Sequence, residues 1–348
     1  MPTISIDTFF ACSLMVSVVI IAIALSANSL GTHIAGIQDL NKEEYLKALS
    51  DYIVTSCGTP ANWGSNATST PETLGLARDG STLPMELDID KVTRLNSENT
   101  FALQYADILK SARLTNIAFG ATISQIIDVS ISLSSNSTVG DSTEYVFTIR
   151  TSRQGEPVMT SLHCYTIAEN FLNDSSSDTS TDGTGSVDVN VPNSSAGQVL
   201  LVAFARASQD PRMTSYGVYS FGHFSSDPLP NGTYLTLSPL NYTMSLSQKT
   251  PDATVERCYS FSHTFASNLT ATSNTTYLIP RDLDDSPLIL VVTGSNISTH
   301  FAEWIAYPQV PLQIGSIFTD SEAHAFEYIV VIKGNFYRLI TRLGGLNP

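Results

Sequence analysis

Two short motifs in this sequence hold residue types that transfer protons or attack a carbonyl group. His163 directly precedes Cys164, and Asp88 and Asp90 flank a single residue, the spacing of paired carboxylates. Neighbouring residues of a strand point to opposite faces, so His163 and Cys164 are not expected to meet. Asp88 and Asp90 begin a helix-like run, where a carboxylate binds free backbone amides. Neither motif therefore predicts a catalytic site.

Longer catalytic and ligand-binding motifs are missing from the sequence as well. It contains no H-E-x-x-H, C-x-x-C, G-x-S-x-G, P-loop or G-x-G-x-x-G pattern, and its six histidines are scattered. Asp174, Asp178 and Asp182 lack the spacing of an EF-hand loop, so the polar segment 173–183 is expected to be a solvated loop. We predict that the protein is not an enzyme and uses no metal and no cofactor. The net charge of −15 disfavours nucleic acid as a partner.

Asparagine-linked glycosylation is the modification that the sequence favours. Nine asparagines stand in Asn-x-Ser/Thr sequences without an intervening proline, and all follow the apolar N-terminal segment. Glycans at these positions would place the chain beyond that segment outside the cell. The alternative is that a chain rich in Ser, Thr and Asn forms some of these sequences by chance. The candidates are Asn66, Asn136, Asn173, Asn193, Asn231, Asn241, Asn268, Asn274 and Asn296.

The cysteines allow one disulfide bond. Cys12 lies in the apolar N-terminal segment, which leaves Cys57, Cys164 and Cys258. Cys164 and Cys258 occupy similar strand-like contexts, LHCYTI and ERCYSF, and are the predicted pair. The alternative is that all three thiols are reduced and buried.

The first element that must position the rest is a long N-terminal helix. Residues 8–38 contain no Asp, Glu, Lys or Arg, and about 20 apolar residues suffice to cross a bilayer core of roughly 30 Å. We predict a membrane span over about residues 9–30. Cleavage of a signal peptide near Ala27 is the alternative. The residues assigned to membrane insertion or assembly are Asp7, Phe9, Phe10, Leu14, Val18, Ile21 and Leu25.

The amphipathic half of the predicted helix covers residues 31–56. Tyr45, Leu49, Tyr52 and Ile53 follow helical spacing and share one face, which we expect to pack against the following domain. Glycine and proline after Cys57 end the helix.

This N-terminal helix, followed by CGTPANWGS (57–65), TLGLA (73–77), LDIDKVTRLN (87–96) and YADILKSA (105–112), resembles the type IV pilin-like proteins of archaea. The resemblance covers about residues 1–135. It implies a helix that anchors in a membrane or packs into the core of a filament, with Asp7 in the place of the acidic residue near the mature N-terminus of pilins. The basic leader that the processing peptidase requires is absent.

From residue 121 onward, short runs rich in Val, Ile, Thr, Tyr and Phe predict a β sandwich. GEPV at 155–158 and TDGTG at 181–185 are similar to Ig-like and prealbumin-like modules, which implies an inserted module at 140–225. Residues 57–139 and 226–348 are expected to form a second β-rich head, with a hairpin turn at Lys333-Gly334-Asn335. The predicted fold class is α+β, mainly β, with a long N-terminal helix and a β-sandwich ectodomain.

These features favour a pilin-like structural or adhesive protein of the cell surface. It would be anchored in a membrane, or assembled with copies of itself into an extracellular filament, through the N-terminal helix. The alternative is a monomeric, membrane-anchored protein that binds a carbohydrate or another surface protein. One aromatic run, Tyr216 to Phe224, is expected to be a sandwich strand, with a sugar-binding strip as the alternative.

Overall fold

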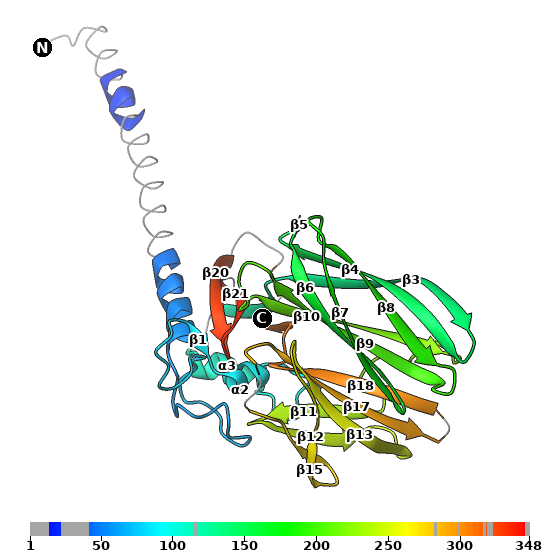
Figure 1. The fold of residues 1–348 in the computed structure, drawn as a ribbon. Coiled ribbons are helices and arrows are strands. Elements are labelled where there is room, and N and C mark those ends of the chain that lie inside the picture. Colours follow the sequence, from blue (N-terminus) through cyan, green and yellow to red (C-terminus); the bar gives the residue numbers. More distant parts are fainter. Residues whose placement is uncertain are drawn as a thin grey trace, which may run out of the picture. The chain divides into compact units, whose positions relative to one another are not determined.

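A computed structural model of the chain describes residues 14–21, 42–114, 117–281, 284–297, 299–315, 318 and 323–344. The chain divides into two units, residues 1–50 and 51–348 (Figure 1). Strands form most of the second unit, so the mainly β character of the prediction is confirmed.

The helical residues of the N-terminal part are 14–21 and 42–55. Leu14, Val18 and Ile21 lie in the first stretch and are exposed. Among the described residues, none of the helices combines the length and the apolarity needed to cross a bilayer. The predicted fold class, with its long N-terminal helix, is therefore wrong, and so is the location in a membrane or filament that was based on this helix. Asp7, Phe9, Phe10 and Leu25 lie outside the described residues.

The buried face of the helix at 42–55 differs from the predicted one. The buried residues are Leu46, Ser50, Ile53 and Val54. They have the same helical spacing as the predicted face, but each lies one residue further along the chain. Of the residues assigned to this face, only Ile53 is fully buried. Leu49 is half-buried, and the two tyrosines are exposed, Tyr45 by 60% and Tyr52 by 48%.

Two short helices and a long loop follow. Asp88 caps α2 (Ile89–Thr93), as predicted, by accepting hydrogen bonds from the amides of residues 90 and 91, and α3 is Tyr105–Ser111. Lys91 is fully buried, and its Nζ donates to the carbonyls of Cys57 at 2.8 Å and Ala77 at 2.7 Å. Burial lowers the pKa of Lys91. This lysine therefore ties both ends of the loop at 57–77 to α2.

A five-stranded sheet joins distant parts of the sequence. Its order is β1 (Glu86–Leu87), β20 (Ala323–Ile332), β21 (Asn335–Gly344), β2 (Ala118–Gln125) and β19 (Leu312–Gly315). The predicted hairpin turn is confirmed, because Ile332 pairs with Asn335 across Lys333 and Gly334. Strands from both sides of residues 140–225 pair in this sheet, which agrees with an insertion there. The domain boundaries themselves stay a prediction.

Strands β3 to β10 form a first sandwich. One sheet holds β3 (Asp128–Val139), β4 (Ser142–Arg153), β5 (Glu156–Pro157) and β8 (Thr184–Pro192). The other has the order β10 (Thr214–His223), β9 (Gly197–Ala207), β6 (Thr160–Ala168) and β7 (Phe171–Asp178). Strand β7 corrects the loop expected at 173–183: it pairs with β6 only, and its exposed polar residues reflect an edge position.

Strands β11 to β18 form a second sandwich. Its inner sheet has the order β14 (Ala266–Asn268), β13 (Ala253–Phe261), β17 (Leu288–Asn296) and β18 (Thr299–Tyr307). Its outer sheet has the order β11 (Leu235–Leu240), β12 (Thr243–Gln248), β16 (Thr276–Leu278) and β15 (Thr270–Ser273).

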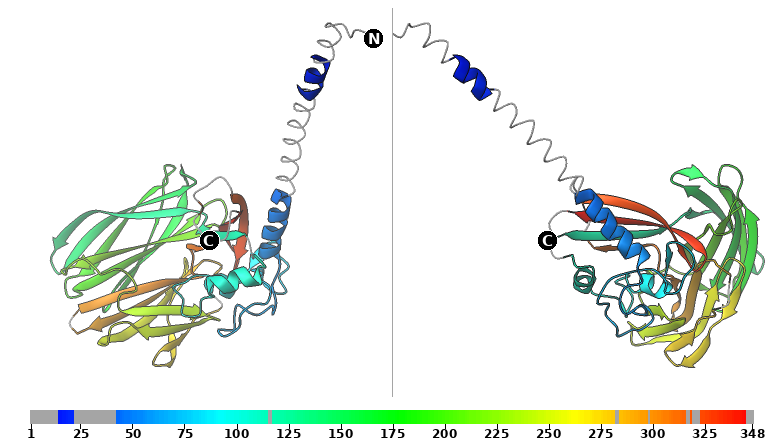
Figure 2. Two further views of the ribbon diagram at one scale, coloured as in Figure 1. Left: turned by 180° about the vertical axis from the view of Figure 1, so that it is seen from behind. Right: turned by 90° about the vertical axis from the view of Figure 1, so that its left-hand side faces the viewer.

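The two sandwiches pack face to face, so four sheets are stacked with three apolar cores between them (Figures 1 and 2). We call the middle core the joint. Tyr165, Leu200 and Phe204 contribute to it from the first sandwich, and Phe261 and Val291 from the second. Strands β9 and β17 are thus covered on both faces, which explains their continuous apolar runs QVLLVAFA and LILVV.

The predicted disulfide bond is wrong. Cys57, Cys164 and Cys258 are free. Cys164 lies in the core of the first sandwich and Cys258 in the core of the second, on opposite sides of the joint. Burial raises the pKa of both thiols to about 12, so they are buried apolar groups rather than reactive thiols.

Candidate functional site

Strand β6 presents one row of side chains to the joint. Because alternate residues of a strand share a face, this row runs from Ser161 and His163 through Tyr165 and Ile167 to Glu169, which follows the end of β6. The middle of the row is apolar, and the Tyr165 ring packs 4.7 Å from that of Phe261, centroid to centroid. Both ends are polar. The two ends of the joint are therefore where its chemistry lies.

The end at Ser161 contains two histidines. His163 Nε2 lies 3.4 Å from Asp174 Oδ2, and its ring is 6.1 Å from that of His263. The Ser161 hydroxyl lies 3.4 Å from His263 Nε2. Burial, followed by the charge of Arg206, lowers the pKa of His263 to about 4. In the described part of the chain, His263 Nδ1 has no hydrogen-bond partner. A weak base without an orienting group does not activate a serine.

An internal ion pair completes this end. Arg206, at the end of β9, places its guanidinium 3.0 Å from Asp284 Oδ2. Burial alone would raise the pKa of Asp284, but hydrogen bonds from Ser286 and Thr264 lower it. The charge of the carboxylate is thus balanced by an arginine within the fold.

The opposite end brings together Glu169, Glu256 and His300. One potential ligand atom from each lies within 4.8 Å of the others, and His300 Nε2 is 3.3 Å from Glu169 Oε2. Glu256 occupies a β-bulge of β13, since the pairing with β17 skips from Val255 to Arg257. Within the described residues, no lysine or arginine forms an ion pair with either glutamate. The neighbouring Arg257 donates instead to Asn170 and Tyr259.

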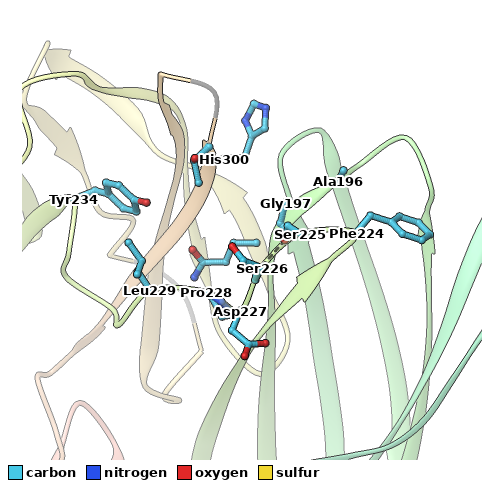
Figure 3. A pocket seen from close by; sticks show the side chains of 12 residues that line it. Ala196, Gly197, Phe224, Ser225, Ser226, Asp227, Pro228, Leu229, Tyr234 and His300 are labelled. Carbon is cyan, nitrogen blue, oxygen red and sulfur yellow. Dashed lines mark hydrogen bonds between the residues drawn. The ribbon is translucent and has the colours of Figure 1, made fainter.

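A groove of about 440 Å³ begins at His300 and follows the connection between the two sandwiches (Figure 3). Polar and apolar side chains both line it. In Figure 3, His300 lies toward one end and Asp227 toward the other. Its lining is Ala196, Gly197, Gln198, Phe224, Ser225, Ser226, Asp227, Pro228, Leu229, Tyr234, Thr299 and His300.

The walls of the groove are fixed by hydrogen bonds across the joint. The Gln198 amide donates to the carbonyl of Ala302 at 2.9 Å and accepts from its amide at 3.2 Å, which ties β9 to β18. After β10 the chain folds back over Gly222, where a Cβ would lie 2.6 Å from the Ser226 carbonyl oxygen. Phe224 follows with a φ of 49° and is 62% exposed. The Phe224 ring packs against that of His223, with 4.4 Å between ring centroids, at the edge of the groove.

The far wall is anchored by a buried carboxylate. Glu303 accepts hydrogen bonds from the amides of Tyr234 at 2.7 Å and Leu235 at 2.8 Å. Burial raises the pKa of Glu303, although these two amides oppose the shift. Tyr234 stacks on Phe301, with 4.6 Å between ring centroids. Hydrogen bonds thus fix part of the groove wall, at Gln198 and Tyr234, which favours binding of a ligand without rearrangement there.

The predicted glycosylation positions are spread over the strands and turns. Asn193 and Asn296 are half-buried, and the other seven are exposed: Asn66, Asn136, Asn173, Asn231, Asn241, Asn268 and Asn274. Asn231 holds the backbone of Trp304 through two hydrogen bonds of 2.9 Å. Use of these positions stays a prediction.

The aromatic run at 216–224 divides between core and groove. Tyr216 is buried in the joint, so most of β10 is a sandwich strand, as expected. Only Phe224, beyond the end of the strand, lines the groove. The sequence does not predict the cluster of Glu169, Glu256 and His300, because no motif links residues so far apart in the chain.

Comparison with known proteins adds little to this geometry. No family model matches the chain, and no curated protein matches it. One similar solved structure is HBP35 of Porphyromonas gingivalis, with 10% identity and a TM-score of 0.20 over 52% of this chain and 63% of that one. The chain thus matches less than two thirds of the length of that structure, and a likeness this weak carries no argument about fold or function.

Proposed function

We propose that this chain is a non-catalytic binding protein of the adhesive class, and that the groove at the joint holds a carbohydrate. The observation that carries the proposal is the combination of an exposed aromatic ring with neighbouring polar groups in one groove. Phe224 offers an apolar face, while Ser225, Ser226 and Asp227 offer hydroxyl and carboxylate groups. Sugars present an apolar face and a ring of hydroxyls, so they match both. The volume of about 440 Å³ lies within the roughly 300–1,000 Å³ usual for ligand sites.

The absence of a competent catalytic group in the groove supports binding rather than turnover. In the described part of the groove, Asp227 is the one carboxylate and His300 the one imidazole, and neither forms a nucleophile–base hydrogen bond there. A hydrolase acting on sugars needs two carboxylates on either side of the scissile bond.

Glycan-array binding by the purified chain tests the proposal, followed by titration calorimetry with the best ligand. Phe224→Ala and Asp227→Asn should each weaken binding at least 10-fold. Phe265→Ala removes another exposed ring, 41% accessible against 62% for Phe224, from the β13–β14 turn and serves as the matched control. Binding that survives both groove substitutions, or that Phe265→Ala weakens equally, would overturn the assignment.

Association with copies of itself is a second candidate function that one observation favours. In the helical stretch at 14–21, apolar side chains are exposed around the whole circumference, which is unusual for a helix in water. These residues are Leu14, Met15, Val16, Val18, Val19, Ile20 and Ile21.

Sedimentation velocity on the full chain distinguishes this candidate. The unsubstituted chain should form oligomers, and Val18→Asp combined with Ile21→Asp should reduce them to monomers. Val139→Asp, which places a charge at a similarly exposed valine of β3, is the control and should leave the oligomers intact. A monomeric unsubstituted chain would exclude self-assembly through this stretch.

A further inference from the structure

We propose that Glu169, Glu256 and His300 form a binding site for a divalent transition-metal cation, with Zn²⁺ as the best match. Glu169 comes from the turn after β6 in the first sandwich, whereas Glu256 on β13 and His300 on β18 come from the second. A cation held by all three would link the two sandwiches at one end of the joint. This site does not depend on the proposed carbohydrate function.

The spacing of the ligand atoms fits a metal better than a hydrogen bond. His300 Nε2 and Glu169 Oε2 are 3.3 Å apart. A charge-assisted hydrogen bond between imidazolium and carboxylate would be about 2.7–2.9 Å. Two ligands bonded to tetrahedral zinc at about 2.0–2.1 Å lie roughly 3.4 Å from each other. The third ligand atom lies within 4.8 Å of both.

The charge of the cluster also favours a cation. Two carboxylates lie beside one imidazole, and none of the described arginines or lysines forms an ion pair with them. Like charges at this distance repel each other unless a positive charge lies between them. The bulge in β13 turns Glu256 toward the cluster instead of pairing it with β17.

The donor set selects the class of metal. One imidazole nitrogen and two carboxylate oxygens suit Zn²⁺ or Mn²⁺, whereas Ca²⁺ takes 6–8 oxygen ligands and Mg²⁺ keeps most of its waters. Three protein ligands leave one position of tetrahedral zinc open. His300 also lines the groove, so the site borders it.

Titration calorimetry with ZnCl₂ on the full chain, freed of metal by chelation, tests the proposal. One Zn²⁺ per chain is expected, and Glu256→Gln and His300→Ala should each weaken binding at least 10-fold. Glu256 is exposed, so Glu256→Gln is expected to fold, which circular dichroism checks. Zinc should also raise the melting temperature of the unsubstituted chain and leave that of Glu256→Gln unchanged.

Two controls exclude other zinc ligands. His163→Ala removes the histidine at the opposite end of the joint, and Cys57→Ser removes the half-buried thiol. Both variants should bind zinc as the unsubstituted chain does. The proposal is overturned if the unsubstituted chain shows no saturable binding, or if Glu256→Gln binds zinc with unchanged affinity.

Discussion

The two ends of the joint are built on the same strands but resolve their charges differently. At one end Asp284 has Arg206 as a partner at 3.0 Å, together with hydrogen bonds from Thr264 and Ser286. At the other end Glu169 and Glu256 share a single histidine. The first end balances the charge of its carboxylate within the fold, and at the second we propose that an added cation does so. Charge balance, rather than the number of polar groups, separates a structural cluster from a ligand site.

Strand β9 shows how small the difference in sequence is. Its joint-facing row begins with Gln198 and ends with Arg206, with Leu200, Val202 and Phe204 between them. The arginine supplies a charge to its end, whereas the neutral glutamine bonds to the Ala302 backbone and supplies none. The apolar middle holds both ends in place.

The largest effect is expected from the apolar middle. Phe261→Ala removes a fully buried ring that packs against Tyr165, and should lower the free energy of unfolding by about 3–5 kcal/mol. Chemical denaturation measures this loss, with Phe265→Ala as a control that should change stability by less than about 0.5 kcal/mol. A loss below about 1 kcal/mol for Phe261→Ala would mean that the two sandwiches do not depend on the joint.

The balanced end should show the next largest effect. Arg206→Met keeps the aliphatic stem but leaves Asp284 without its cation, and should cost about 2 kcal/mol, since both side chains are mostly but not fully buried. A double-mutant cycle with Asp284→Asn isolates the pair. If Asp284→Asn restores no stability to Arg206→Met, the guanidinium acts by packing rather than by charge.

The same end predicts a dependence of stability on pH. His263 has a folded pKa lowered to about 4, from 6.5 in the unfolded chain, through burial and then Arg206. Between these values the unfolded state binds more protons, so stability falls as pH drops from about 6.5 to 4. The loss should be about 1 kcal/mol after allowing for partial solvent exposure. His263→Gln should flatten this part of the stability curve. Arg206→Met should raise the folded pKa of His263 toward 6.5 and so reduce the loss of stability.

Features that depend on neighbouring residues could be predicted from the sequence. Sites that bring together residues from distant parts of the chain could not. The apolar runs of β9 and β17, the turn at Lys333-Gly334 and the cap at Asp88 each follow from neighbouring residues. Strand β7 was mistaken for a loop because an edge strand needs no apolar face.

The metal cluster depends on a different kind of information. It requires the stacking of two sandwiches and a bulge that turns Glu256 inward, and neither leaves a periodic signal. The prediction for the N-terminal residues rested on apolar composition alone, and among the described residues no helix is both long and apolar enough to cross a bilayer.

The smallest expected effect is the change in stability caused by Glu256→Gln. It tests the difference between the two ends most directly, because its sign depends on whether a cation is bound. In the presence of a chelator, Glu256→Gln removes one of two repelling carboxylates, and should leave stability unchanged or raise it by up to about 0.5 kcal/mol. With saturating zinc the order should reverse, since only the unsubstituted chain gains stability from binding. Thermal unfolding of both chains under both conditions measures this reversal. A loss of more than about 1 kcal/mol in the chelated state would show that Glu256 is already balanced within the fold, as Asp284 is, and that the two ends of the joint do not differ.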